Sequence, residues 1–253
     1  KRIAEETADW LAREMTDSAG GFYSTLDADS EAGEGDYYVW SQAEVKQLLS
    51  DQEYAHLASF YGLDQEANFE QRWHLHNQSD IETLSSRLGT TEENAEAIIG
   101  QARAKLLKQR DGRKSPGRDD KILTTWNALM IKGLARSARL LDNPNHKRLA
   151  LAACNFIQTT LWDGTKLKAC HKTGITYGNG YLDDYANLID ALLEVLQIHW
   201  DGALLKFATE LADQLLARFE DKQLGGFYFT AHDHEALIYR PKSFGDDSLT
   251  AGN

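Results

Sequence analysis

The chain has 253 residues, of which 42% are hydrophobic, and is long enough to bury a substantial core as one domain. Its 39 Asp and Glu residues outnumber 27 Lys and Arg residues, and no basic stripe is present, which argues against a nucleic-acid partner. No apolar run reaches the roughly 20 residues of a membrane-spanning helix, so no membrane partner is expected. Cys154 and Cys170 form neither a CxxC pair nor a metal-binding set, which indicates free thiols in a reducing, cytoplasmic compartment.

The first predicted helix covers residues 2–16, where apolar residues recur every fourth position and charges occupy the opposite face. An acidic, Gly-bearing loop follows and places Asp27, Asp29 and Glu31 ahead of an aromatic run. The spacing of its carboxylates does not fit a calcium loop. The loop is interpreted either as a solvated surface loop or as a rim loop that contributes acids to a cleft.

The pattern between residues 41 and 112 is less regular. Ser41 with Glu44 predicts a capping box at the start of one helix, and Thr91 begins another. Residues 109–118 are basic and contain Gly and Pro, which indicates a solvated connector.

Helices of two kinds alternate in the second half of the chain. Residues 122–141 and 181–198 are apolar around most of the helix circumference, as a helix packed on two sides must be, whereas 204–219 has one apolar stripe. This alternation is typical of stacked helical hairpins with an inner and an outer layer. The predicted fold class is therefore all-α, an incomplete α/α toroid of helical hairpins with short β segments in the loops. It forms a single domain over residues 1–253, which we expect to be cut at both ends.

Two sequence repeats support this prediction. Acidic pairs recur at intervals of 63 or 64 residues, at Asp119-Asp120, Asp183-Asp184 and Asp246-Asp247. Because inner helices of successive hairpins begin at the same end, we expect these pairs to converge on one rim. The sequence GGFY stands at 20–23 and again at 225–228, each time after a striped helix, which predicts a glycine C-cap followed by an extended segment.

Carboxylates interleaved with aromatic side chains suit a sugar, because rings stack on apolar sugar faces while acids and amides bind hydroxyls. Helix capping by aspartate explains one acid at each inner helix but not the second. Asp120 and Asp184 are the predicted catalytic acids. The predicted substrate-binding residues are Asp27, Asp29, Glu31, Asp119, Lys121, Trp126, Asn127, Tyr185, Arg240, Lys242 and Asp247. None of the eight histidines forms an HExxH pair, so neither a metal nor a cofactor is expected.

Several motifs occur in a fixed order along the chain: GGFYSTLDADSE with YYVW, RDDKILTTWNALMIKGLA, YLDDYANLIDALLE, GGFYFT, and RPK with AGN. Together they resemble the helical portion of the spermatogenesis-associated thioredoxin-like protein family. The resemblance covers nearly the whole chain. It implies a toroid similar to that of N-acylglucosamine 2-epimerases and six-hairpin glycosidases, together with an N-terminal thioredoxin-like domain that is absent here. The family pattern is matched by the predicted site residues and by Ser30 and Pro241, with a departure around Asp247.

Two functions of different classes remain open. The first is a carbohydrate-active enzyme, glycoside hydrolase-like or sugar epimerase-like, in which one carboxyl protonates a leaving oxygen and another activates water. Its expected partner is a sugar or glycan. The second is a non-catalytic binding or scaffold module that works with the thioredoxin-like domain of the parent chain.

Overall fold

A computed structural model describes residues 1–30 and 33–253. Where the sequence predicts one domain, contacts within the chain divide it into two compact units. Unit 1 contains residues 1–25 and 118–253, and unit 2 contains residues 26–117. The chain passes between the units at β1 (Thr25–Leu26) and β6 (Arg118–Asp119).

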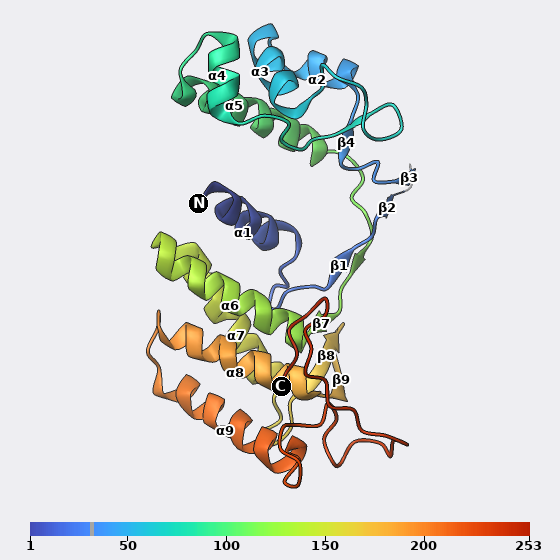
Figure 1. Cartoon of the computed structure of the whole chain (residues 1–253), viewed down its shortest axis with the longest axis vertical. Helices are drawn as coiled ribbons and strands as arrows, with labels where there is room; N and C mark the ends of the chain where they lie inside the picture. The colour runs from blue at the N-terminus through green and yellow to red at the C-terminus, as the bar shows by residue number, and fades with distance from the viewer. Residues whose placement is uncertain (31–32) are drawn as a thin grey trace. The chain divides into compact units, whose positions relative to one another are not determined.

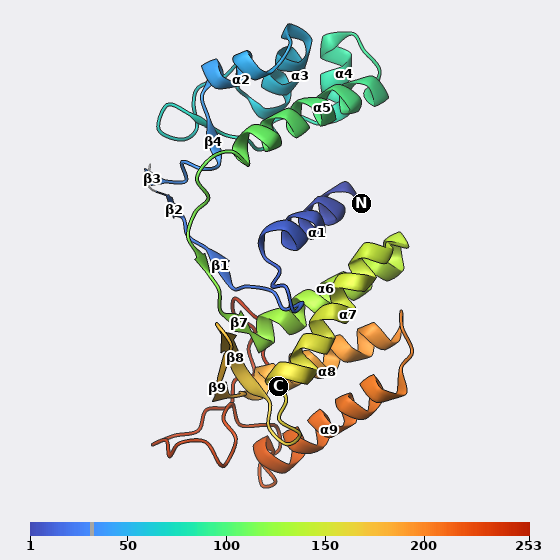
Figure 2. The same cartoon turned by 180° about the vertical axis from the view of Figure 1, so that it is seen from behind.

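Unit 1 is built from helical hairpins. After α1 (Arg2–Glu14), its helices are α6 (Thr124–Leu141), α7 (Pro144–Phe156), α8 (Leu182–Leu196) and α9 (Gly202–Phe219), and α7 runs on into a π-helical segment, η1 (Ile157–Leu161). Figures 1 and 2 show α6 to α9 side by side, with α6 packed against both α7 and α8, and α8 packed also against α9. The predicted all-α class of helical hairpins with short strands in the loops is confirmed.

The inner helices are α6 and α8, whose apolar residues are buried on several faces, including Ile131 and Leu188. The prediction that a helix starts at Ile122 is wrong by two residues. Ile122 and Leu123 instead form β7, which pairs antiparallel with β8 (Lys168–Lys172), and β9 (Ile175–Asn179) completes the three-stranded sheet. A β-branched residue pairs well on a pleated surface, which favours the strand at this position.

The GGFY repeat forms the same turn twice. After α1, the Asp17 N–H donates to the Gly21 carbonyl at 2.8 Å, and after α9 the Asp221 N–H donates to the Gly226 carbonyl at 2.9 Å. The expected glycine C-caps are wrong, because Met15 and Glu220 are the C-cap residues. The glycines lie in the turn beyond, where Gly20 has a φ of 109° and a Cβ would meet the Ala152 carbonyl oxygen at 2.8 Å.

In three places a side chain holds the extended segment that follows an outer helix: Asn127 and Tyr185 lie near the start of an inner helix, and Asn253 lies in the C-terminal segment. Asn127 on α6 accepts from the Phe22 N–H at 2.7 Å and donates to the Phe22 carbonyl at 2.9 Å. Asn253 makes the same pair of bonds with Phe227, also at 2.7 and 2.9 Å. On α8 the Tyr185 hydroxyl accepts from the Leu167 N–H at 2.8 Å. These bonds satisfy backbone groups that have no ladder partner.

Unit 2 has its own hydrophobic core. Its helices are α2 (Gln42–Leu48), α3 (Asp51–Tyr61), α4 (Ile81–Leu88) and α5 (Glu92–Arg110), and its strands are β2 (Asp29–Ser30), β3 (Gly33–Glu34), β4 (Val39–Trp40) and β5 (Trp73–His74). Val45, Leu57, Leu84 and Ala102 are among the residues at the centre of the core. The capping box at Ser41 and the helix start at Thr91 are confirmed, whereas α3 and α4 are additions to the prediction.

Replacing Asn127 with Ala tests the joint between α6 and the segment after α1. The change leaves the Phe22 N–H and carbonyl buried without partners, at a cost of about 1–3 kcal/mol for each group. We expect the free energy of unfolding, measured by urea titration, to fall by about 2–6 kcal/mol. The matched control is Asn155→Ala at an exposed position on α7, which should change it by less than about 0.5 kcal/mol. Equal losses in the two variants would contradict the assignment.

Candidate functional site

The second acidic pair lies beside the start of the first inner helix. Asp184, in the first turn of α8, accepts hydrogen bonds from the Thr125 N–H at 2.9 Å and the Thr125 hydroxyl at 2.5 Å. Its other carboxylate oxygen accepts from the Tyr181 N–H at 2.8 Å, which completes a capping box. The starts of α6 and α8 are therefore adjacent, as the repeat predicted.

Asp184 is only 5% exposed, and burial raises its pKa to about 6. The hydrogen bonds from Thr125 and Tyr181 act in the opposite direction because they stabilise the ionised form, but burial outweighs them. The neighbouring charge of Asp183 raises the pKa further. Both oxygens of Asp184 accept hydrogen bonds from the protein, so this carboxyl connects the start of α8 to the start of α6.

Asp183 faces the C-terminal segment. It accepts from the Gly252 N–H at 2.8 Å, and burial raises its pKa. In the same segment the Ala251 N–H donates to Asp246 at 3.0 Å, so the second and third acidic pairs also lie close together. One turn further along α8, Asn187 accepts from the Thr250 hydroxyl at 3.1 Å, while its buried amide nitrogen has no partner among the described residues.

The first pair lies between β6 and β7: Asp119 is the last residue of β6, and Asp120 follows it. Asp119 forms ion pairs with Lys121 at 2.9 Å and Lys172 at 3.1 Å, and these lysines lower its pKa to about 2. The register that pairs Ile122 with His171 places Lys121 opposite Lys172 on the two strands. Asp119 is therefore a fixed anion between two cations.

Asp120 has a more open environment. Its side chain is 43% exposed and forms an ion pair with Arg118 at 2.7 Å. The Arg118 guanidinium also donates to the Glu14 carbonyl at 2.9 Å and lies 4.0 Å from the centre of the Tyr23 ring. Arg118 is therefore held in place while the Asp120 carboxylate remains accessible. Trp126, in the first turn of α6, is 41% exposed and presents an aromatic surface to solvent.

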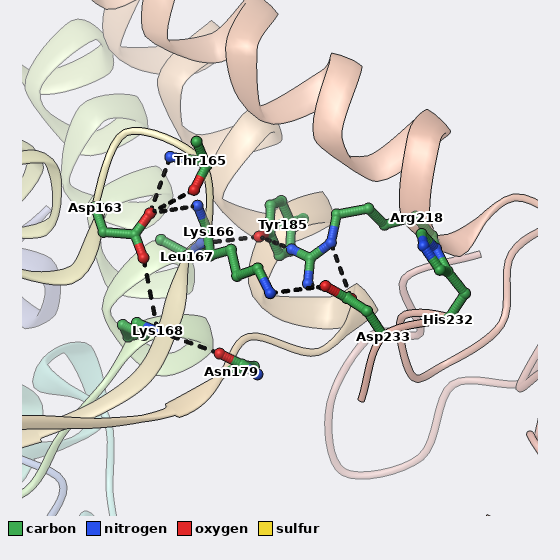
Figure 3. A network of polar contacts seen from close by, with 10 residues as sticks. All are labelled: Asp163, Thr165, Lys166, Leu167, Lys168, Asn179, Tyr185, Arg218, His232 and Asp233. Carbon is green, nitrogen blue, oxygen red and sulfur yellow. Dashed lines mark hydrogen bonds and ion pairs between the residues drawn. The ribbon is translucent and has the colours of Figure 1, made fainter. Parts of the chain in front are cut away.

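Tyr185, a predicted substrate-binding residue, is fully buried in the polar network of Figure 3. Its hydroxyl accepts from Arg218 at 3.0 Å as well as from the Leu167 N–H. Arg218 also pairs with Asp233 at 2.6 Å, and Lys166 reaches the other oxygen of Asp233 at 2.7 Å. Partial burial acts to raise the pKa of Asp233, but Lys166 and Arg218 hold it well below its ordinary value. The network ties α8 and α9 to the turn before β8.

Asn127, Arg240 and Lys242 also bind protein groups. Asn127 is buried and binds the backbone of Phe22. Arg240 donates to the Thr230 carbonyl, and its guanidinium lies 4.2 Å from the centre of the Tyr228 ring. Lys242 pairs with Asp221 at 2.6 Å and holds the pKa of that carboxyl well below its ordinary value. These three side chains support turns instead of lining an open surface.

The remaining predicted residues lie elsewhere. Asp27 accepts from the Asp29 N–H at 3.1 Å within unit 2, and Glu31 falls outside the described residues. Asp247 is exposed near the end of unit 1, where its N–H donates to the Leu249 carbonyl at 3.1 Å. Across residues 1–30 and 33–253 there is no group of three or more His, Cys, Asp or Glu side chains arranged to hold a metal ion.

The structure adds Asp183, Asn187, Thr125 and Lys172 to the residues at this end of unit 1. A signal for Asp183 is present in the sequence, since capping accounts for only one acid of each pair. Nothing in the sequence indicates Lys172, because its position beside Lys121 depends on the pairing of β7 with β8.

Asp184 predicts a specific dependence of stability on pH. Its folded-state pKa of about 6 lies above the ordinary aspartate value of 3.8, so folding favours proton uptake between these values. This contribution to the free energy of unfolding is fully present below pH 3.8 and is lost as the pH rises through 6. The difference of about two pKa units corresponds to about 3 kcal/mol.

We expect Asp184→Asn to remove this pH-dependent contribution, in urea titrations of the wild type and the variant between pH 4 and 8. The control is Asp213→Asn, which changes an exposed carboxyl on α9 and should leave the wild-type profile intact. Parallel stability curves for the wild type and Asp184→Asn would show that Asp184 does not titrate in this range.

No helix in the part of the chain that the structure describes has the length and apolar character needed to cross a membrane. Among solved structures, a cellobiose 2-epimerase from Spirochaeta thermophila is similar with a TM-score of 0.43 and 21% identity, covering 49% of this chain and 32% of that chain. The α-1,6-mannanase GH76A from Salegentibacter sp. is similar with a TM-score of 0.41 and 16% identity, covering 96% and 59%.

No family model matches the chain. Spermatogenesis-associated protein 20 of Homo sapiens is 29% identical over 262 residues, which cover 89% of this chain and 33% of that protein. An uncharacterized protein of Caenorhabditis elegans is 28% identical over 223 residues, covering 76% and 31%. The chain thus spans about a third of the length of the curated relatives it matches. These relatives confirm the resemblance to the spermatogenesis-associated proteins that the motifs indicated.

Proposed function

We propose that unit 1 binds a carbohydrate at the end where α6 and α8 begin and acts on it by acid–base chemistry. The observation that carries the proposal is the difference in pKa among carboxyls gathered at this end. The pKa of Asp119 is lowered to about 2, whereas the pKa values of Asp183 and Asp184 are raised. A raised pKa favours a carboxyl that can give up a proton in the reaction, and a lowered pKa favours a permanent anion.

The contacts of each carboxyl distinguish their proposed roles. Asp184 holds the start of α8 against α6 and acts as a positioning residue, because both of its oxygens bind protein donors. Its neighbour Asp183 has a raised pKa and a single backbone donor, which suits a general acid. The exposed carboxylate of Asp120 is the candidate base that activates water. Asp120 is thus retained from the predicted catalytic pair, and Asp183 takes the place of Asp184 in it.

Aromatic and charged side chains supply the binding surface. Trp126 and Tyr177 are 41% and 45% exposed, and their rings are suited to stack on the apolar face of a sugar. The ion pairs of Asp119 with Lys121 and Lys172 supply donors and an acceptor suited to sugar hydroxyls. Asp119 stays ionised through the physiological range and contributes a fixed acceptor.

A second candidate function is a non-catalytic scaffold that works with another part of a longer protein. It is supported by the internal contacts of Asn127, Tyr185, Arg240 and Lys242, which bind protein groups. In such a module the repeated polar side chains fix hairpin geometry, and the acidic pairs cap helices.

A panel of monosaccharides and oligosaccharides, followed by thermal shift, tests carbohydrate binding, because a ligand that binds only the folded state raises the melting temperature. We expect at least one sugar to raise it saturably and Trp126→Ala to weaken that binding by about tenfold. Trp200→Ala is the matched control, since Trp200 is also exposed, on the connection between α8 and α9, and should bind as the wild type does. If no sugar gives a saturable shift, the scaffold function is favoured.

Turnover of a bound sugar tests the acid–base roles separately. Removing a general acid lowers the rate by about 100- to 10,000-fold. We therefore expect Asp183→Asn to lose turnover by at least 100-fold while its affinity stays within a few-fold of wild type, with Asp213→Asn as the control. Binding without turnover in the wild type would retain the carbohydrate site and reject the catalytic roles.

A further inference from the structure

Unit 2 contains a cavity of about 320 Å³. Its charged lining residues are Asp36, Glu44, Arg72, Arg113 and Lys114, and Tyr37 adds a phenol. Volumes of about 300 Å³ and above are typical of pockets that bind small molecules. All of these residues belong to unit 2, so the cavity is distinct from the carboxylates of unit 1.

The cavity lining carries more cationic than anionic side chains, whereas the chain as a whole is acidic. Three cationic side chains face two carboxylates here, although the chain as a whole has a net charge of -12. Partial burial acts to raise the pKa of Glu44, but hydrogen bonds from Ser41 and the charges of Arg113 and Arg72 hold it below its ordinary value. Both carboxylates are also engaged, Glu44 in the capping box of α2 and Asp36 in an ion pair with Arg72.

Arg113 is fixed as part of the cavity wall. One of its guanidinium nitrogens donates to the carbonyls of Tyr37 and Val39, both at 2.8 Å, and lies 3.3 Å from the Asp36 carbonyl. The guanidinium lies 4.0 Å from the centre of the Trp40 ring. Its second terminal nitrogen approaches Glu44 at 3.4 Å. A guanidinium held in this way binds a further acceptor with little loss of side-chain entropy.

Arg72 and Tyr37 retain donors for a ligand. Arg72 uses one guanidinium nitrogen to bind Asp36, and its other guanidinium nitrogens have no partner within residues 1–30 and 33–253. Tyr37 is 6% exposed, and its hydroxyl likewise has no hydrogen-bond partner in the described part of the chain. A planar guanidinium with spare N–H groups matches the geometry of a carboxylate or phosphate.

We propose that this cavity binds a small organic anion through a carboxylate or phosphate group. Arg72 and Arg113 bind the anionic oxygens, Lys114 adds charge, and the Tyr37 hydroxyl donates to the ligand. The volume admits a ligand about the size of a monosaccharide acid or a sugar phosphate. Because the carboxylates are engaged with protein donors, the free hydrogen-bonding capacity of the cavity is that of donors, which selects an anion.

The test is a titration of the whole chain with inorganic phosphate and, separately, with D-glucuronate, at constant ionic strength, followed by amide chemical shifts and melting temperature. We expect saturable changes with at least one anion, and the better anion identifies phosphate or carboxylate as the preferred group. Arg72→Gln should weaken binding by at least tenfold. Lys108→Gln, the same loss of charge at an exposed position on α5, should bind within twofold of wild type.

Tyr37→Phe provides a second variant, because it removes a hydroxyl without a protein partner and leaves the ion pair of Arg72 intact. We expect it to weaken binding by about three- to tenfold with an unchanged melting temperature in the absence of ligand. Stabilisation that rises without saturation in every variant indicates general salt effects and overturns the proposal. Equal affinities for Arg72→Gln and Lys108→Gln also overturn it.

Discussion

The hairpins of unit 1 depend on hydrogen-bond partners for the backbone N–H and C=O groups at the places where an extended segment follows an outer helix. The backbone groups of Phe22 and Leu167 are buried there, and a buried N–H without a partner costs about 1–3 kcal/mol. A side chain from the next inner helix supplies the missing partner, as Asn127 does for Phe22 and Tyr185 does for Leu167, and Asn253 in the C-terminal segment does the same for Phe227. These joints fix the separation and direction of successive hairpins, and the acidic pairs are placed by them.

The carboxylates acquire different properties because the joints give them different surroundings. Asp184 is enclosed between the starts of α6 and α8, and burial dominates its pKa, whereas Asp119 lies between two lysines on the edge of the sheet. Similar residues in successive repeats therefore have unlike proton affinities. Acids that only capped helices would not need different pKa values. The difference in pKa therefore supports an acid–base role for the end of unit 1.

Unit 2 is inserted into unit 1, where the sequence predicts a single domain. Residues 26–117 leave unit 1 after Thr25 and return at Arg118, and within unit 1 the Ser24 N–H and hydroxyl both donate to the Asp119 carbonyl. The insertion therefore starts and ends at neighbouring points, which leaves the hydrogen bonds of unit 1 intact. Its separate core supports a cavity whose cationic lining contrasts with the acidic pairs of unit 1.

The sequence by itself determined α1, α2, α5, α6, α8 and α9, because amphipathic periodicity and capping residues such as Ser41 act within a few residues of one another. It also determined that the acidic pairs meet at one end, since a repeat of 63 or 64 residues sets the direction of each inner helix. Only the tertiary structure decided which acid is buried, which is paired with lysine and which is exposed. Burial and ion pairing depend on residues far apart in the chain, as Lys172 beside Asp119 and Thr125 beside Asp184 show. Local sequence patterns do not identify those neighbours.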